Sequence, residues 1–231
     1  MKTRGFTLVE LLVAIGIVAT LAAITLSSLS AMRTRARCIQ CVSNLSQWGM
    51  ALQMYIKDND GYLPRRGQGV QPVFLYDRTD DWFNCLTPYL EMPSYWELYQ
   101  AGKTPKPHER SIFVCPAADA STTANSTNFI TYGMNIFIGR TDQTYRTKIA
   151  ALPNITTLAF MADSPGGYAS TVPSPYAYSV LARHGGKANV AFFDGHVQTF
   201  SGDYLGCGTG MKTQPDIHWR SGMDGDNWTP Y

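Results

Sequence analysis

The sequence predicts an α+β fold in which a long N-terminal helix, with a transmembrane first half, packs on a C-terminal antiparallel β-sheet head. Three observations predict this fold. Phe6–Leu26 is an apolar run that contains a single charged residue, Glu10. The pattern then becomes amphipathic, and no proline interrupts it before Pro64. From about residue 62 the chain is rich in glycine, proline, serine, threonine and aromatic residues, which is typical of β structure with long loops.

The apolar run is long enough to cross a bilayer, since about 20 helical residues are needed. A basic leader with Lys2 and Arg4 precedes it and ends in Gly5. A secretory signal fits poorly, because the apolar run of 21 residues is longer than a usual signal core and its charge lies near the front. A plain membrane anchor explains the length but not Glu10. A carboxylate inside a membrane costs several kcal/mol unless something pairs with it. The apolar run itself contains no cation, so a partner for Glu10 has to come from elsewhere.

The segment Gly5-Phe6-Thr7-Leu8-Val9-Glu10-Leu11-Leu12 resembles the processing signal of type IV prepilins. The resemblance implies that a prepilin peptidase cuts between Gly5 and Phe6 and methylates the new amine of Phe6. It also implies that Glu10 pairs with the Phe6 amine of a neighbouring pilin-like subunit during assembly. A single pass through the bacterial inner membrane, with the head periplasmic or extracellular, follows from the same resemblance.

The charge balance gives no sign of a nucleic-acid partner. The chain has 19 basic and 17 acidic side chains, a net charge of +2. Cleavage after Gly5 would remove two of the basic ones, Lys2 and Arg4, and leave the two signs in balance. The basic residues that follow the apolar run, among them Arg33 and Arg37, give no clear positive-inside asymmetry.

The second part of the expected helix carries one apolar stripe with steps of three or four residues. The stripe consists of Leu29, Met32, Ala36, Ile39, Val42, Leu45, Trp48 or Gly49, Leu52 and Ile56. Asp58-Asn59-Asp60-Gly61 is a turn-forming cluster, so we expect a helix from Phe6 to Lys57, roughly 75 Å long. The predicted segments are a leader at 1–5, a transmembrane helix half at 6–29, an amphipathic half at 30–58 and one head at 59–231.

Five strands are expected in the head, and the strongest signal among them is a hairpin around Asp194-Gly195. The expected strands are Ser111–Cys115, Thr156–Ala162, Tyr176–Leu181, Ala188–Phe193 and His196–Phe200. Roughly 170 residues suffice for one hydrophobic core, so a single head domain is predicted.

A second resemblance rests on His184, which nine residues separate from Asp194-Gly195. This H-X9-DG pattern is similar to the one that names a group of large bacterial pilin-like proteins. Other pieces of the chain resemble the same group: Cys41-x-x-Asn44-Leu45, Asp58-Asn59-x-Gly61-x-Leu63-Pro64, Cys115-Pro116, Tyr132-Gly133-Met134-Asn135 and Asp163-Ser164. The motif is specific to the group but indicates no particular activity.

Histidine and carboxylate side chains are candidate metal ligands in two places. His184, Asp194 and His196, with Asp163 as a further candidate, suit zinc or manganese. We favour structural roles, because Asp194 suits the turn and the side chains of Asp194 and His196 should diverge across a two-residue hairpin. Asp224 and Asp226 lie in an acidic turn that resembles a calcium loop, although it lacks EF-hand spacing. The expectation is therefore no cofactor, with calcium as the alternative.

The chain has five cysteines, at positions 38, 41, 85, 115 and 207. An exported head would meet an oxidising compartment, which favours disulfides, although the odd count leaves at least one thiol over. Cys38 and Cys41 lie deep inside the expected helix, where a redox Cys-x-x-Cys site lacks the helix N-terminus that activates it. Catalytic elbows, P-loops and dinucleotide fingerprints are absent from the sequence, so no enzymatic activity is expected.

Together these features predict a pilin-like structural subunit, a pseudopilin or minor pilin of a type IV pilus or a type II secretion pseudopilus. The alternative is a membrane-anchored extracytoplasmic glycan-binding protein that uses the prepilin route only for export. In that case exposed aromatic residues would bind sugar rings. Its candidate platforms are Trp82, Trp96, Tyr99, Trp219 and Trp228.

Overall fold

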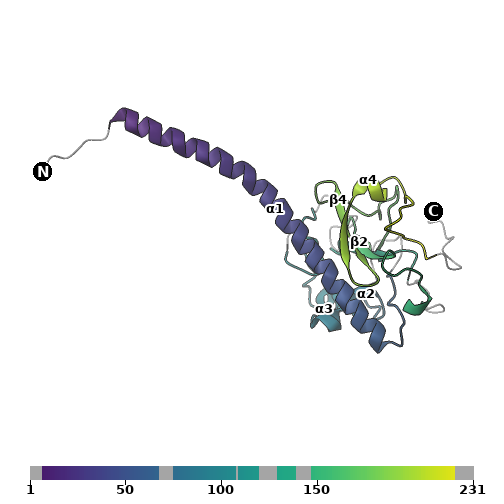
Figure 1. The fold of residues 1–231 in the computed structure, drawn as a ribbon. Coiled ribbons are helices and arrows are strands. Elements are labelled where there is room, and N and C mark those ends of the chain that lie inside the picture. Colours follow the sequence, from purple (N-terminus) through teal and green to yellow (C-terminus); the bar gives the residue numbers. More distant parts are fainter. Residues whose placement is uncertain (1–6, 68–74, 108, 120–128, 139–146, 222–231) are drawn as a thin grey trace. The chain divides into compact units, whose positions relative to one another are not determined.

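The structure is a computed structural model that describes residues 7–67, 75–107, 109–119, 129–138 and 147–221 (Figure 1). It divides into two compact units, Met1–Ala36 and Arg37–Tyr231. Helix α1 (Leu8–Asp58) passes through both units and has 51 residues. The helix predicted from Phe6 to Lys57 is thus confirmed to within two residues at its start and one at its end.

The end of α1 follows the predicted turn signal. Asp60 and Gly61 both adopt left-handed backbone conformations, with φ of 52° and 81°. The Gly61 N–H donates to the carbonyl of Ile56 at 2.9 Å, and the Asn59 side chain donates to the carbonyl of Tyr55 at 2.9 Å. Two of the carbonyls left over at the helix end are therefore satisfied before the chain turns into the head.

The first unit contains a segment, Leu8–Leu26, that is long and apolar enough to cross a membrane. Its large side chains, for example Leu12, Ile15 and Val18, are all more than half exposed. Apolar surface of this extent is normally covered by lipid or by another protein.

The described part of the second unit contains one sheet of five strands, two of which the sequence did not predict. They are β1 (Tyr132–Asn135), β2 (Ala159–Asp163), β3 (Ser170–Thr171), β4 (Lys187–Phe192) and β5 (Val197–Ser201). Their order in the sheet is β3-β1-β2-β4-β5. β1 pairs in parallel with β3, and the other neighbours are antiparallel. The predicted antiparallel sheet is therefore a mixed sheet, because β3 joins it beside β1 rather than beside its neighbour in sequence.

Short helices complete the second unit. They are α2 (Trp82–Cys85), the 3₁₀ helix η1 (Thr87–Leu90), α3 (Tyr95–Gln100), the 3₁₀ helix η3 (Ile149–Ala151) and α4 (Gly202–Leu205).

The β4–β5 hairpin around Asp194-Gly195 confirms the strongest strand prediction. Gly195 has φ of 93°, and its N–H donates to the carbonyl of Phe192 at 2.9 Å. β2 begins three residues later than expected. Two strand predictions were wrong, since Ser111–Cys115 holds only a local bridge between Ser111 and Val114, and Tyr176–Leu181 contributes one isolated bridge. Apolar side chains in both segments are buried, but the backbone there forms turns and bends instead of strands.

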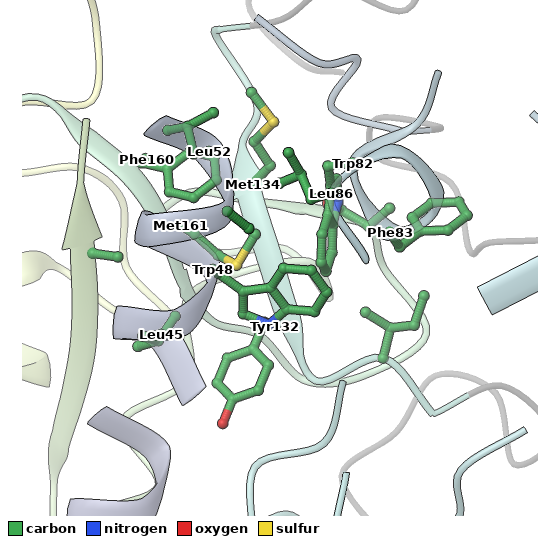
Figure 2. Close-up of a cluster of buried hydrophobic side chains, with 14 of the residues drawn as sticks. Leu45, Trp48, Leu52, Trp82, Phe83, Leu86, Tyr132, Met134, Phe160 and Met161 are labelled. Atoms are coloured by element: carbon green, nitrogen blue, oxygen red, sulfur yellow. The ribbon is translucent and has the colours of Figure 1, made fainter. Parts of the chain in front are cut away.

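The C-terminal part of α1 forms one wall of the head core. Figure 2 shows Leu45, Trp48 and Leu52 of α1 among side chains of α2, β1 and β2. Together with Ile56 they confirm the predicted stripe from residue 45 onward. For the residues before Cys41 the predicted stripe was wrong, because the side chains of Met32 and Ile39 are 65% and 63% exposed and do not face the head core.

Trp48 is the centre of this core. Its indole N–H donates to the carbonyl of Ile112 at 3.0 Å. Its ring meets Trp82 edge-on at 5.0 Å between centroids and lies 5.5 Å from Phe113. The buried indole therefore combines apolar area, aromatic contacts and a satisfied polar group.

Helix α1 also lies directly against the β4–β5 turn. A Cβ atom at Gly49 would come within 3.0 Å of the carbonyl oxygen of Gly195. Gln53, one turn further along, donates its side-chain N–H to the carbonyl of Phe193 at 2.7 Å. The two glycines thus permit close contact between the backbones of the helix and the hairpin.

Asp81 is a fully buried carboxylate whose nearest cation is imperfectly placed, with Arg65 Nε at 3.6 Å. Burial raises the pKa of Asp81 from 3.8 to about 7, although Arg65 opposes the shift. A carboxyl group with a raised folded-state pKa costs stability as the pH rises from the unfolded pKa to the folded one. We therefore expect Asp81→Asn to be more stable than the wild type above pH 7, by up to roughly 4 kcal/mol, and equal to it below about pH 4.

The measurement is urea unfolding of both proteins between pH 4 and 8. Asp80→Asn is the matched control, because Asp80 is partly exposed and pairs with the same arginine at 3.3 Å. A stability difference between Asp81→Asn and the wild type that does not change with pH would contradict the prediction.

Candidate functional site

The first candidate site is the start of α1, where Glu10 closes a capping box with Thr7. The backbone N–H and the hydroxyl of Thr7 both donate to Glu10 Oε2 at 2.8 Å. The Glu10 N–H donates back to Thr7 Oγ1 at 3.3 Å. Gly5 and Phe6, the predicted processing residues, lie outside the described residues. Glu10 is thus hydrogen-bonded within its own chain but has no cation in the described part of the apolar segment.

The second candidate site is a buried cluster in the head formed by Cys41, Cys115, Asp163 and His184. Cys41 lies on α1, Asp163 is the last residue of β2, and His184 lies in the turn before β4. Cys115 follows the Ser111–Val114 bridge. Each residue offers one possible ligand atom, a sulfur, a ring nitrogen or a carboxylate oxygen, and these four atoms all lie within 4.8 Å of one another. The cluster therefore joins four segments that are distant in sequence.

Hydrogen-bonding distances connect all four side chains. The Cys41 thiol donates to Asp163 Oδ1 at 3.0 Å. His184 Nε2 lies 3.4 Å from Cys115 Sγ and 3.4 Å from Asp163 Oδ2. The other ring nitrogen, Nδ1, is buried without a partner in the described part of the chain, so contacts at Nε2 set the orientation of the ring.

Backbone and neighbouring side chains hold the cluster in place. Asp163 Oδ2 also accepts the Asn189 N–H at 2.9 Å. The Cys115 N–H donates to Thr131 Oγ1 at 2.5 Å. Tyr132 lies beside the two cysteines, and the Asn44 amide donates to its hydroxyl at 3.2 Å.

Burial and mutual contacts shift the pKa values of three of these groups. Burial raises the pKa of Cys41 well above its usual value, and contacts with Cys115 and Asp163 add to the shift. Burial alone would also raise the pKa of Cys115, but interactions with Cys41 and His184 lower it to about 6. Burial would lower the pKa of His184, but hydrogen bonds to Asp163 and Cys115 raise it to about 10. Negative charge is thus favoured on Cys115 and positive charge on His184.

The same geometry does not provide a nucleophilic triad. In a cysteine or serine triad the two ring nitrogens face different partners, so that one takes the proton while the other is held by an acid. Here Nε2 faces both Cys115 and Asp163. Cys115 is also completely buried, so a substrate has no direct access to its sulfur atom.

The structure separates the histidine and carboxylate candidates of the sequence into two places. Asp194 and His196 lie at the exposed β4–β5 turn, where His196 Nδ1 is 2.6 Å from Asp194 Oδ1. The expectation that these side chains diverge was wrong, because the His196 ring stacks on Phe192 at 4.2 Å and brings Nδ1 back to the turn. Asp194 does stabilise the turn, since it accepts the His196 N–H at 3.1 Å. Asp224 and Asp226 lie outside the described residues.

His184 instead groups with Asp163 and with two cysteines that were not predicted as ligands. Each of the five cysteines is a free thiol. A signal for this grouping was present in the sequence, because the four members belong to four pieces that carry the H-X9-DG resemblance. Those pieces begin at Cys41, Cys115, Asp163 and His184.

Two of the five aromatic residues considered as sugar platforms are unsuitable. Trp82 and Trp219 are buried, and Trp228 lies outside the described residues. Trp96 stacks on Tyr99 at 5.7 Å between centroids, and Tyr99 is 46% exposed. Of the four candidates that the structure describes, Trp96 and Tyr99 are therefore the two that remain as a possible sugar platform.

The comparisons with known proteins agree with the apolar helix and its N-terminal motif. Residues 1–26 match the model described as a prokaryotic N-terminal methylation motif. The chain is thus a type IV pilin-like protein with a prepilin-type signal, and in the described residues Leu8–Leu26 is one segment long and apolar enough to anchor it in a membrane. Residues 30–171 match the family described as "Protein of unknown function (DUF1559)", and because this covers more than half of the chain, the protein belongs to that family. Neither the curated proteins nor the solved structures gave a match.

Proposed function

We propose that the protein is a pseudopilin or minor pilin that assembles through the N-terminal part of α1 into a type IV pilus or a type II secretion pseudopilus. A prepilin peptidase would release Phe6, and other pilin-like subunits would pack along Leu8–Leu26. The head would lie on the outer side of the inner membrane. Its role is interaction rather than catalysis. Two observations support this: His184 is buried, and one ring nitrogen, Nε2, faces both Cys115 and Asp163.

One observation carries this proposal: an apolar helix whose large side chains are all more than half exposed contains one carboxylate, Glu10, the fifth residue after the predicted cleavage site. Thr7 satisfies Glu10 with neutral donors but does not cancel its charge. When apolar neighbours cover the helix, a cation must compensate that charge. The Phe6 amine of an adjacent subunit is a cation that assembly itself would bring into reach, and it remains one after a single methylation.

Replacing Glu10 by alanine is the direct test. We expect Glu10→Ala to be cleaved after Gly5 as in the wild type but to be lost from filaments. Removing one partner of a buried ion pair costs about 3–5 kcal/mol, which corresponds to a loss of more than a hundredfold. The measurements are mass spectrometry of the N-terminus and the amount of protein in sheared or cross-linked filaments.

Two further variants separate charge from helix capping. Thr7→Ala removes the capping hydroxyl but keeps the carboxylate, so it should still assemble. Glu97→Ala is the matched control, because Glu97 closes the same kind of capping box with Ser94 on α3. Normal filaments from Glu10→Ala, or a loss of filaments from Glu97→Ala as large as that from Glu10→Ala, would contradict the assembly role of Glu10.

A further inference from the structure

The buried cluster of the head has the donor atoms and spacing of a four-coordinate metal site. Two thiol sulfurs, one imidazole nitrogen and one carboxylate oxygen face one another. Zinc bonds of 2.0–2.3 Å in tetrahedral geometry place neighbouring ligand atoms about 3.3–3.8 Å apart. The distances of 3.0 Å from Cys41 to Asp163, 3.4 Å from Cys115 to His184 and 3.4 Å from His184 to Asp163 are close to this range. The other pairs of ligand atoms lie within 4.8 Å of one another, so shifts of at most about 1 Å would complete the tetrahedral geometry.

We propose that Cys41, Cys115, Asp163 and His184 together bind one zinc ion. Thiolate and imidazole ligands favour zinc over the hard cations calcium and magnesium. Because all four ligands come from the protein and all are buried, the site has no open position for a substrate. It is a structural zinc site rather than a catalytic one.

The surroundings of the site suit a bound cation. With both thiols and the carboxyl ionised, the ligands carry three negative charges, and zinc would leave one. The guanidinium of Arg183, the residue before His184, donates to the carbonyl of Ser164, the residue after Asp163, so a positive charge lies beside the ligands. Asn189 also orients the carboxylate of Asp163 through its backbone N–H. Outer contacts of this kind fix metal ligands in their binding orientation.

Zinc at this position would cross-link helix α1 to the sheet. Cys41 is the only ligand from α1, whereas Asp163 ends β2 and His184 precedes β4. The unfolded chain does not hold these residues together, so the free energy of zinc binding would add to the stability of the folded head. His184, the histidine of the H-X9-DG pattern, would therefore be a metal ligand, in contrast to the sequence-based expectation of no cofactor.

The competing state is a disulfide between Cys41 and Cys115, which would consume both thiolates. An exported head meets oxidising conditions, in which such a bond can persist. Zinc and the disulfide exclude each other at this site, so a measurement of the thiol state distinguishes them directly.

The first experiment uses the full chain, purified in detergent from the membrane without added metal or chelator. We expect close to one zinc per chain by elemental analysis and two unmodified thiols at Cys41 and Cys115 by alkylation and peptide mass spectrometry. Removing the metal with a chelator should lower the melting temperature of the head, and adding Zn²⁺ back under reducing conditions should restore it. Ca²⁺ and Mg²⁺ should not restore it.

The second experiment replaces ligands one at a time and uses Co²⁺ as a spectroscopic probe. Wild-type protein should give the intense bands of tetrahedral cobalt together with thiolate-to-cobalt charge transfer. Cys41→Ser should lose about half of the charge-transfer intensity. Cys41→Ser and His184→Gln should each bind Zn²⁺ at least about 100-fold more weakly, because losing an outer-shell partner alone already costs about 10–100-fold. The control variants are Cys85→Ser and His196→Gln, which alter a cysteine and a histidine outside the cluster and should leave zinc content unchanged.

The proposal is overturned if the reduced, chelator-treated wild type does not bind Zn²⁺ or Co²⁺ at micromolar concentrations. It is also overturned if zinc content survives in both Cys41→Ser and His184→Gln, or if membrane-derived protein contains a Cys41–Cys115 disulfide. If a ligand variant fails to fold, the zinc content and thiol state of the wild type still decide the question. None of these results depends on filament assembly, so the zinc site and the proposed function can fail separately.

Discussion

Replacing Trp48 by alanine is expected to lower the free energy of unfolding of the head by about 3–5 kcal/mol. The side chain is fully buried, so its removal leaves a large cavity between α1, α2 and the Ile112–Phe113 segment. The edge-on contact with Trp82 is lost, and the carbonyl of Ile112 loses its donor. Because domains are stable by only about 5–15 kcal/mol, this single change would remove a large share of the stability of the head.

Hydrogen exchange of the head in increasing urea would measure this effect without relying on tryptophan fluorescence. Trp96→Ala is the matched control, because Trp96 is only partly buried and stacks on a partly exposed tyrosine. Its expected cost is about 1 kcal/mol. Equal costs for the two variants would show that Trp48 is not central to the core.

Replacing Asn135 by aspartate should be nearly as destabilising, although the two side chains have the same shape. The Asn135 amide donates to the carbonyls of Ala159 and Trp219 at 2.8 and 2.9 Å, and its oxygen accepts the Phe137 N–H at 3.0 Å. An aspartate would leave both carbonyls without donors and would place a buried negative charge against them. Each unsatisfied buried group costs about 1–3 kcal/mol, and the charge costs more.

This second prediction carries a pH dependence that a simple packing defect would not show. Burial and the two carbonyls should raise the pKa of the new carboxyl group above its unfolded value near 4. The deficit of Asn135→Asp should therefore be smallest at acid pH and should grow as the pH rises through the folded pKa. Unfolding curves at pH 4 and pH 8 would test this, with Asn154→Asp as the control at an exposed position with φ of 49°.

The elements predicted correctly from the sequence are those whose local residue pattern agrees with their place in the folded structure. Helix α1 has a continuous helical pattern and a turn cluster at its end, and the β4–β5 hairpin has Asp194-Gly195 between apolar alternations. β1 was missed because Gly133 and Asn135 disfavour strands in isolation. Its place in the sheet depends on tertiary contacts, namely a close approach to Thr171 at Gly133 and the three hydrogen bonds of Asn135.

The buried cluster could not be derived from spacing, because its members are separated by tens of residues along the chain. The Cys38-x-x-Cys41 pair suggested a local relation between two thiols. In the structure Cys38 lies instead near the side chain of Asn189, and Cys41 faces Asp163. Cys41 reaches Cys115, Asp163 and His184 only when α1 packs against β2 and β4. No periodicity in the sequence predicts that contact.

The burial of α1 residues in the head core also determines how mechanical load passes through the protein. Trp48 and Leu52 belong to the same continuous helix as Leu8–Leu26, so a pull on the N-terminal segment acts on the core through the helix backbone. A force strong enough to draw α1 away from the β4–β5 turn would remove a wall of the core, and the head should therefore yield as one cooperative unit rather than strand by strand.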